Sequence, residues 1–346
     1  MEAKEDHLRD WSSLLPEMLN HIDKNLSELS DFVRFRAVCK AWRFSTPIID
    51  QPPQFPWIFV HGYGEPDPDF WCYPITSNKK YTFNAPKIFC MALQTTSDGY
   101  IIAQHSLEIN ENPLSHHFFL FNPLNNHEIR LPAIDFDEHV FPWKYQTGKY
   151  VFCYHHDKLS FWYPGQNSWH ESNLASWDIH VYVMMLCYKN MIFFLENETG
   201  VIKAIDMFTG TLIYDIPPTK DYSTEDVQYM VEALGDILMV IQRSSDSVLS
   251  ERFDVYRLDA NKSGSPCWIK VTSIGDRALF IDCCSALTFR ANDFARIKSN
   301  SIYFFWDYNN GKCKVKRMDL ETGTVECLQD LFMRLPVWFV PNLHHL

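Results

Sequence analysis

Glycine, positive charge and long apolar runs are all scarce in this sequence. Only 12 of the 346 residues are glycine, which excludes collagen-like and glycine-rich low-complexity chains. The longest apolar stretch, residues 181–195, is interrupted by Tyr188, Lys189 and Asn190 and is shorter than the roughly 20 residues that cross a bilayer. The net charge of −12 leaves no basic surface of the kind that nucleic acid requires. We therefore expect neither a membrane protein nor a nucleic-acid-binding protein.

Motifs for metal binding and catalysis are also missing. The ten cysteines are scattered, without a Cys-x-x-Cys pair, and no Gly-x-Ser-x-Gly, P-loop or His-Glu-x-x-His motif occurs. The adjacent histidine pairs at 116–117, 155–156 and 344–345 are poor chelates, because neighbours on a strand point to opposite faces. We expect free thiols, no cofactor, no metal and no catalytic residues. A remote alternative is an enzyme whose carboxylates meet in a central channel.

The first part of the chain has helical periodicity. From residue 11 to residue 46 the apolar positions follow a spacing near 3.6: Leu15, Leu19, Ile22, Leu26, Leu29, Phe32, Val33, Phe35, Val38 and Trp42. Pro16 followed by Glu17 predicts a helix start. Residues 1–10 are charged, lack an apolar signal core and are expected to be disordered. Residues 47–56 hold four prolines and predict a short stiff linker.

After residue 57 short apolar runs alternate with polar turns, which is typical of β-strands. Pairs of strands recur with anchors at residues 122, 164, 206, 259 and 319, and hairpins precede most of them. Four strands repeating every 40 to 60 residues indicate the blades of a propeller. Residues 57–346 have room for about six blades, with seven as an alternative count and an irregular β-sandwich as an alternative fold. Residues 336–341 are predicted to complete the first blade.

The helical segment resembles an F-box. The likeness rests on Leu-Pro-Glu-Met-Leu at 15–19 and Val-Cys-Lys-Ala-Trp-Arg at 38–43. It implies a three-helix motif at residues 11–46 that binds the SKP adaptor of a cullin-RING ubiquitin ligase. The positions that match the apolar contacts of the family are Leu15, Pro16, Leu19, Ile22, Val38, Cys39 and Trp42. So short a segment buries too little apolar area to stand alone, which agrees with a partner-bound motif.

Residues 57–346 resemble the KIB-type β-propeller found behind plant F-boxes. Residues 275–281, 300–304, 318–323 and 336–341 support this likeness. Together the two resemblances imply a substrate-recognition subunit of an SCF-type ligase, in which SKP connects the chain to cullin and RING subunits. Such a subunit is not itself an enzyme. A non-degradative scaffold that blocks a partner by occupancy is the alternative, and we expect either protein in the nucleus, the cytoplasm or both.

Loop lengths predict which face of the propeller binds a target. The second turn of each blade and the connection to the next blade share one face, and the longer loops fall there: 104–115, 132–147, 172–179, 217–226 and 244–250. These loops contain ten acidic residues and two lysines. Acidic loops with aromatic residues suit a basic protein segment. The candidate contacts are Asp137, Glu138, Trp143, Trp177, Tyr222 and Asp226.

Overall fold

The computed structural model of the chain divides into two units. Residues 1–55 with 342–346 form one, here called the helical unit, and residues 56–341 form the other, here called the propeller unit. The structure describes residues 10–61, 69–75, 79–84, 88–95, 99–105, 115–116, 118–132, 134–135, 151–155, 158–171, 182–196, 198–245, 248–260, 266–282, 286–306, 313–331 and 336–344. Each unit is described separately below.

The helical unit contains three α-helices, as the resemblance to an F-box implies. They are α1 (Pro16–Asp23), α2 (Leu29–Ala37) and α3 (Lys40–Ser45), with 3₁₀ turns η1 (Trp11–Ser13) and η2 (Ile48–Asp50). Pro16 occupies the first turn of α1, where its missing N–H costs no hydrogen bond. Helix α3 contacts both α1 and α2, and the buried side chains of Leu19, Leu29 and Phe32 form the core. In the described part of the chain no helix is long and apolar enough to span a membrane.

Residues 47–56 are more structured than a plain linker. Besides η2, the segment holds the buried Gln54, whose amide donates to the carbonyls of Ser27 and Pro52. Gln51 donates to Asn342 Oδ1 at 2.7 Å and accepts from the backbone N–H of Leu343 at 3.0 Å. These two bonds explain why the last residues of the chain group with the helical unit.

The propeller unit contains six sheets of three to five strands within the described residues. Blade 1 is β26-β1-β2-β3 (Val337–Phe339, Trp57–His61, Asp69–Pro74, Tyr81–Asn84) and blade 2 is β4-β5-β7-β8 (Ile88–Thr95, Ile101–His105, Phe118–Asn122, His127–Arg130). Blade 3 is β10-β11-β12 (Val151–His155, Lys158–Trp162, His170–Glu171) and blade 4 is β13-β14-β15-β16 (Tyr182–Tyr188, Met191–Glu196, Ile202–Asp206, Leu212–Ile216).

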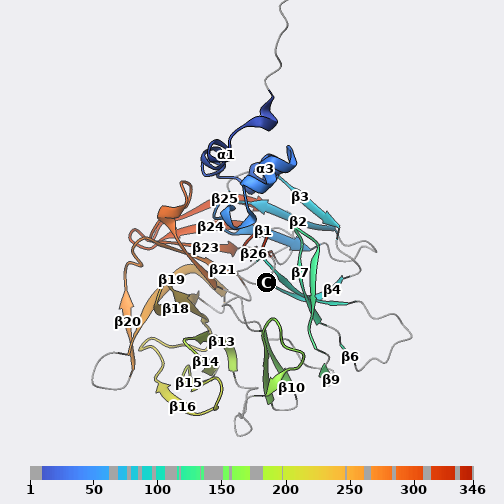
Figure 1. Ribbon diagram of the computed structural model, residues 1–346. Coiled ribbons are helices and arrows are strands. Elements are labelled where there is room, and N and C mark those ends of the chain that lie inside the picture. The colour runs from blue at the N-terminus through green and yellow to red at the C-terminus, as the bar shows by residue number, and fades with distance from the viewer. Residues whose placement is uncertain are drawn as a thin grey trace, which may run out of the picture. The chain divides into compact units, whose positions relative to one another are not determined.

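Blade 5 is β17-β18-β19-β20 (Val227–Ala233, Asp236–Ser245, Val248–Asp259, Cys267–Val271). Blade 6 is β22-β21-β23-β24-β25 (Ala286–Arg290, Arg277–Ile281, Ser301–Trp306, Cys313–Asp319, Val325–Leu331). The short strands β6 (Ser115–His116) and β9 (Ile134–Asp135) pair with each other. Figure 1 shows the six sheets following one another around a common centre. The expected all-β propeller of about six blades is confirmed.

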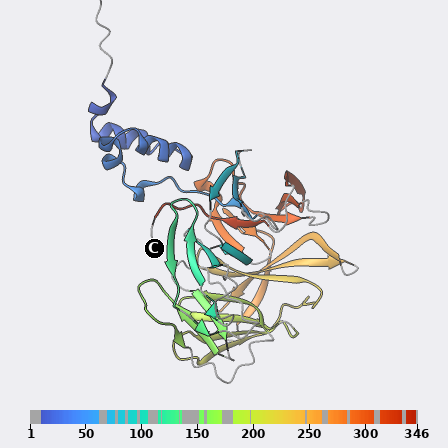
Figure 2. The same cartoon turned by 90° about the vertical axis from the view of Figure 1, so that its right-hand side faces the viewer.

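Apolar clusters lie between neighbouring blades, because a single blade cannot bury both of its faces. One cluster joins Phe161 of blade 3, Ile192 of blade 4 and Met239 of blade 5, and another joins Val240 of blade 5 to Leu279 of blade 6. The innermost strands β13, β17 and β22 contact one another in turn. The long hairpin of β18 and β19 is clearest in Figure 2, in the tan part of the colour range.

The chain closes the ring by returning its last strand to the first blade. Strand β26 pairs antiparallel with β1, with Trp57 opposite Phe339 and Phe59 opposite Val337. The neighbouring blade 6 holds Trp338: its indole Nε1 donates to Ile281 O at 3.0 Å and its ring stacks on Phe305. The prediction that residues 336–341 complete the first blade is confirmed.

Blade 6 differs from the other blades in its strand order. After β21 the chain turns inward to add β22 at the centre and then returns through η4 (Ala291–Asp293) to β23. Strands β21 and β23 are therefore parallel, with Ala278 opposite Ser301. The sequence analysis located both strands but did not predict their order in the sheet.

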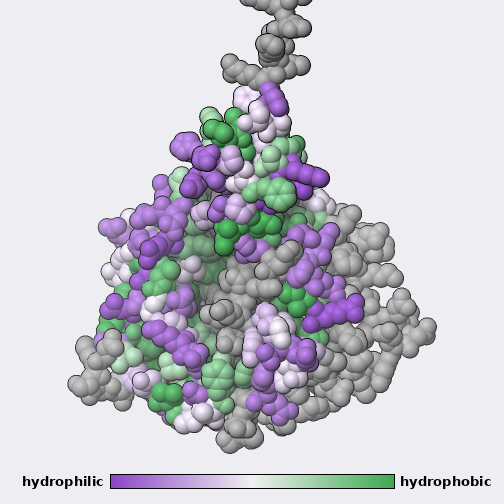
Figure 3. Space-filling model, in the orientation of Figure 1, coloured by the Kyte–Doolittle hydropathy of each residue, from purple (hydrophilic) through white to green (hydrophobic). Residues whose placement is uncertain are grey.

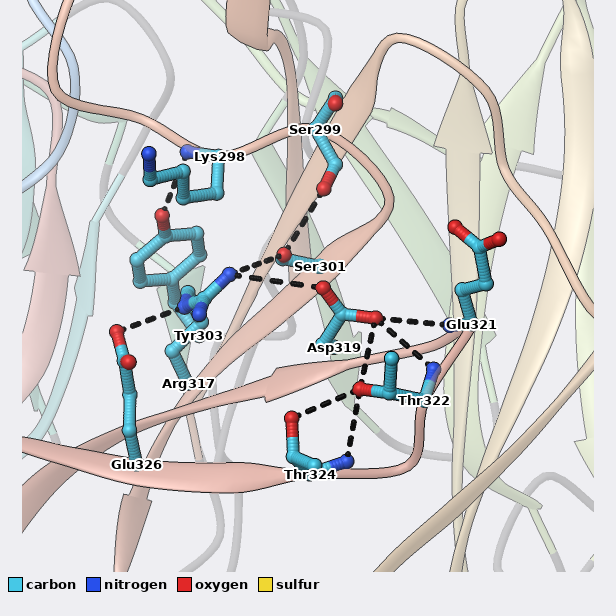
Figure 4. A network of polar contacts seen from close by, with 10 residues as sticks. All are labelled: Lys298, Ser299, Ser301, Tyr303, Arg317, Asp319, Glu321, Thr322, Thr324 and Glu326. Atoms are coloured by element: carbon cyan, nitrogen blue, oxygen red, sulfur yellow. Dashed lines mark hydrogen bonds and ion pairs between the residues drawn. The ribbon is translucent and has the colours of Figure 1, made fainter.

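A repeated turn sequence, Asp-x-x-Thr-Gly-Thr, ends the third strand of blade 4 at 206–211 and β24 at 319–324. In the second copy Asp319 Oδ1 accepts from the N–H groups of Glu321 and Thr322, both at 3.0 Å (Figure 4). Gly323 follows with a φ of +68°, which glycine adopts without strain. These turns fix the register of the hairpins that they close.

Candidate functional site

The helical unit carries most of the exposed large apolar side chains among the residues that the structure describes. Fourteen large apolar residues are exposed among the described residues, and eight of them belong to this unit: Trp11, Leu15, Met18, Ile22, Val33, Val38, Phe44 and Ile49. A unit of this size has too small a core to hide them, and exposed apolar residues gathered on one small unit mark a protein-binding surface. Figure 3 shows green atoms at this end of the chain, around the helices that Figure 1 labels α1 and α3.

Three of these residues form a stripe along α1. Leu15, Met18 and Ile22 are 62%, 52% and 39% exposed, and their spacing of three and four residues places them on one side of the helix. Pro16, next to Leu15, is exposed as well. Leu19 points the other way and is fully buried, so it packs the helices together and is not available to a partner in this structure. The exposed stripe therefore does not include Leu19, which the sequence analysis had predicted as an adaptor contact.

The predicted contacts at the start of α3 have mixed environments. Val38 is exposed, whereas Cys39 and Trp42 are half-buried. The Trp42 indole donates to Trp11 O at 2.9 Å, and its ring centroid lies 4.4 Å from that of Phe35. Trp42 therefore ties η1 and α2 to α3, while its remaining exposed part is open to a partner.

The sequence analysis did not predict several exposed apolar residues of this unit as adaptor contacts. Met18 could have been found from its spacing of three from Leu15 and four to Ile22. Phe44, 84% exposed at the end of α3, and Ile49 in η2 have no such signal, because their exposure depends on how the turns after α3 run.

Asp23, at the end of α1, is buried without a partner for Oδ1. Loss of solvation and the nearby charge of Asp50 raise the pKa of the Asp23 carboxyl, and Arg36 only partly offsets this. A raised folded-state pKa means that the folded chain binds the proton more tightly than the unfolded chain. The contribution of Asp23 to stability therefore falls as pH rises from the ordinary pKa of 3.8 through the raised value.

We expect Asp23→Asn to stabilise the helical unit by about 1 kcal/mol at neutral pH, because it removes a buried unpaired charge. Native-state hydrogen exchange of the α1 and α2 amides, compared near pH 7 and near pH 4, measures this effect. The gain should shrink at the lower pH. Asp31→Asn is the matched control, since Asp31 is exposed and paired with Arg34 at 3.0 Å. An Asp23→Asn chain that exchanges faster than the parent at both pH values would refute the assignment.

In the propeller unit, the connection between blades 4 and 5, residues 217–226, is held by an ion-pair network. Arg243 of β18 lies 2.7 Å from Asp226 Oδ2 and donates to Asp221 O at 2.7 Å. It also pairs with Asp254 at 2.7 Å. Burial opposes ionisation of Asp254, but Lys270 and Arg243 outweigh it and hold the pKa of this carboxyl below its usual value. The network anchors the connection on blade 5.

The network corrects the expected role of Asp226. Its side chain is only 6% exposed, and besides Arg243 it accepts from the backbone N–H of Ser244 at 2.7 Å. A carboxylate engaged in this way shapes the loop and is not offered to a basic partner. The sequence could not show this, because Arg243 and Asp226 come from different segments.

Tyr222, from the same connection, packs on the turn after β14. A Cβ added to Gly200 would lie 2.4 Å from the Tyr222 ring, so only glycine fits beneath it. Burial, with the charges of Glu196 and Glu198, raises the pKa of the Tyr222 hydroxyl. Tyr222 thus brings together the second turn of blade 4 and the connection to blade 5, two segments assigned to the same face. The other predicted contacts, Asp137, Glu138, Trp143 and Trp177, lie outside the described residues.

No metal site is found in the described parts of the chain, where no three His, Cys, Asp or Glu side chains are suitably grouped. Burial raises the pKa of the Cys72 thiol, and it raises the pKa of the Cys187 thiol to about 12. Both thiols are therefore protonated at neutral pH and are poor nucleophiles. Two further cysteines that are adjacent in the sequence, Cys283 and Cys284, lie outside the described residues.

Comparisons with known proteins show the family of this chain. The family model of the KIB1-4 beta-propeller matches residues 72–330. An F-box/kelch-repeat protein of Arabidopsis thaliana is 24% identical, covering 90% of this chain and 91% of the relative. A probable F-box protein of the same plant is 23% identical, covering 97% of both chains. The chain belongs to the KIB1-4 beta-propeller family and is of the plant F-box type, with an N-terminal three-helix unit before the propeller.

Proposed function

We propose that this protein is the substrate receptor of an SCF-type cullin-RING ubiquitin ligase. The observation that supports this most is the exposed apolar surface of the helical unit, with the stripe of Leu15, Met18 and Ile22 on α1. A SKP-family adaptor would cover that surface and link the chain to the cullin and RING subunits. The two F-box relatives that match nearly the whole chain support the same assignment.

The chain would act by holding a target protein close to the ubiquitin-loaded enzyme and would not itself catalyse a reaction. The helical unit holds the adaptor, the propeller unit holds a target protein, and the target is thereby kept near the ubiquitin-loaded enzyme. Raising the effective concentration of the target lysines accelerates transfer without any catalytic group in this protein. The arrangement needs neither a cofactor nor a metal.

The target surface that we propose is the face with Tyr222 and the longer loops. Three exposed acidic residues, Glu198, Asp221 and Glu225, accompany Tyr222. Lys220 is the single lysine of the 217–226 connection. An acidic surface of this kind favours a basic target segment by accelerating encounter. Because the Arg243 network holds the connection in place, little ordering entropy is lost on binding.

Reconstitution tests the proposal. Purified full-length chain, SKP adaptor, and cullin-RING subunits should form one complex of equal stoichiometry in size-exclusion chromatography with light scattering. Proximity labelling by the full chain in plant cells, with and without a proteasome inhibitor, should then reveal proteins that accumulate only under inhibition. A chain that forms no complex with any SKP adaptor would disprove the receptor function. Stable partners whose abundance ignores the inhibitor would favour a non-degradative scaffold.

A further inference from the structure

Within the described part of the propeller unit, exposed apolar side chains are concentrated at one strand. Six large apolar residues of this unit are exposed among the described residues, and four of them fall between residues 208 and 214: Phe208, Leu212, Ile213 and Tyr214. Single exposed apolar residues are normal on a protein surface, whereas a contiguous group marks a binding site. Three of the four belong to β16.

Strand β16 is the outer strand of blade 4. The order β13-β14-β15-β16 leaves its outer edge unpaired within the described residues, and Figure 1 places it at the rim. Apolar atoms reach the surface in that region of Figure 3. Its backbone N–H and C=O groups on that side remain able to pair with another strand.

Two of the other outer strands carry two charges each, which discourage such pairing. Strand β8 has Glu128 and Arg130, and β25 has Glu326 and Asp330. Charged side chains at a sheet edge are a common protection against strand addition. Strand β16 has one charge, Asp215, as β20 has one in Lys270, and β3 has none. Among these three outer strands, β16 alone has exposed large apolar residues.

Hydrogen bonds before β16 and prolines after it fix both ends of the strand, so its edge is ordered before a partner binds. Asp206 Oδ1 accepts from the N–H groups of Phe208 at 3.0 Å and Thr209 at 2.8 Å and so fixes the preceding turn. Pro217 and Pro218 follow the strand and end it, because proline has no N–H to donate. A bulge between residues 212 and 214 increases the local twist of the strand.

Asp215 indicates the charge of the partner. Its side chain is 58% exposed and its cross-strand neighbour Lys203 lies 3.9 Å away, a weak contact that leaves the carboxylate accessible. A lysine or arginine on an added strand would stand opposite this carboxylate, and cross-strand pairs of opposite charge are stabilising.

We propose that the edge of β16 binds an extended segment of the target protein, which adds to blade 4 as a fifth strand. Apolar side chains of the segment cover Leu212, Ile213 and Tyr214, and a basic side chain pairs with Asp215. Main-chain hydrogen bonds supply affinity, and the alternating side chains supply specificity. The identification of the segment as target rests on the proposed receptor function.

A synthetic peptide of four alternating Lys-Val repeats, titrated onto the full-length protein, tests the edge. We expect amide exchange of residues 212–216 to slow at least about tenfold at saturation. A Glu-Val peptide of the same length should bind at least about tenfold more weakly, since it repels Asp215. A Lys-Val peptide with alternate N-methyl groups should not bind, because it cannot form the ladder of hydrogen bonds.

Two variants separate a specific edge from a general attraction. Asp215→Lys should reverse the preference toward the Glu-Val peptide, and Ile213→Thr should weaken binding while keeping strand propensity. Leu328→Thr, on β25, is the matched control and should bind as the parent does, with thermal melting to confirm that all three chains fold. Binding of neither peptide, undiminished binding of the N-methylated peptide, or protection away from β16 would overturn the proposal. Measuring SKP adaptor binding on the same samples shows whether the receptor function fails independently.

Discussion

The chain with Leu15→Asp and Ile22→Asp is expected to lose its affinity for the SKP adaptor by about 1000-fold. Truncating a buried interface anchor costs about 2 kcal/mol or more, so two anchors together cost about 4 kcal/mol. Aspartate adds the penalty of burying a charge against an apolar partner. Both side chains are exposed in the free protein, so the helical unit should fold as before. Surface plasmon resonance with immobilised adaptor measures the change.

The matched control replaces Leu328, an exposed leucine on β25 of the propeller unit, with aspartate. It changes the same residue type to the same charge on a surface that the receptor model does not use for SKP. Its affinity for the adaptor should equal that of the parent. Undiminished adaptor binding by the Leu15→Asp, Ile22→Asp chain would show that α1 is not the docking helix.

Trp338→Ala is expected to open the propeller ring. The side chain is fully buried, stacks on Phe305 with ring centroids 4.4 Å apart, and meets Phe280 edge-on at 5.1 Å. Replacing such an aromatic residue with alanine costs about 3–5 kcal/mol, and Ile281 O also loses its indole donor. Urea unfolding followed by circular dichroism should show a lower midpoint for the propeller transition.

Trp338→Phe separates packing from hydrogen bonding at this position. Phenylalanine keeps much of the stack but lacks the indole N–H, so we expect a loss of about 1–2 kcal/mol, between the parent and the alanine variant. The backbone bond from Trp338 N–H to Asp282 Oδ2, at 2.9 Å, is unchanged in both variants. An alanine variant with the midpoint of the parent would mean that β26 does not close the ring.

Local sequence patterns predicted most elements of the fold. The spacing of apolar residues predicted that residues 11–46 are helical, and the short apolar runs predicted strands such as β13, β14, β17 and β18. These predictions succeeded because helix and strand periods place apolar residues on one side of an element within a few residues. The strand order of blade 6 was not predicted, since pairing of β21 with β23 joins residues more than twenty positions apart.

The amino-acid sequence alone was sufficient for the two-part organisation, the return of residues 336–341 to the first blade, and the resemblance to an F-box. Which side chains face a partner was decided only by tertiary packing. Leu15 and Leu19 are both apolar residues of the same motif, yet one is exposed and the other is buried, because α3 covers one side of α1. Asp226 likewise belongs to an acidic loop, but Arg243 from β18 neutralises it. Burial and ion pairing depend on distant segments meeting in space, which no local pattern records.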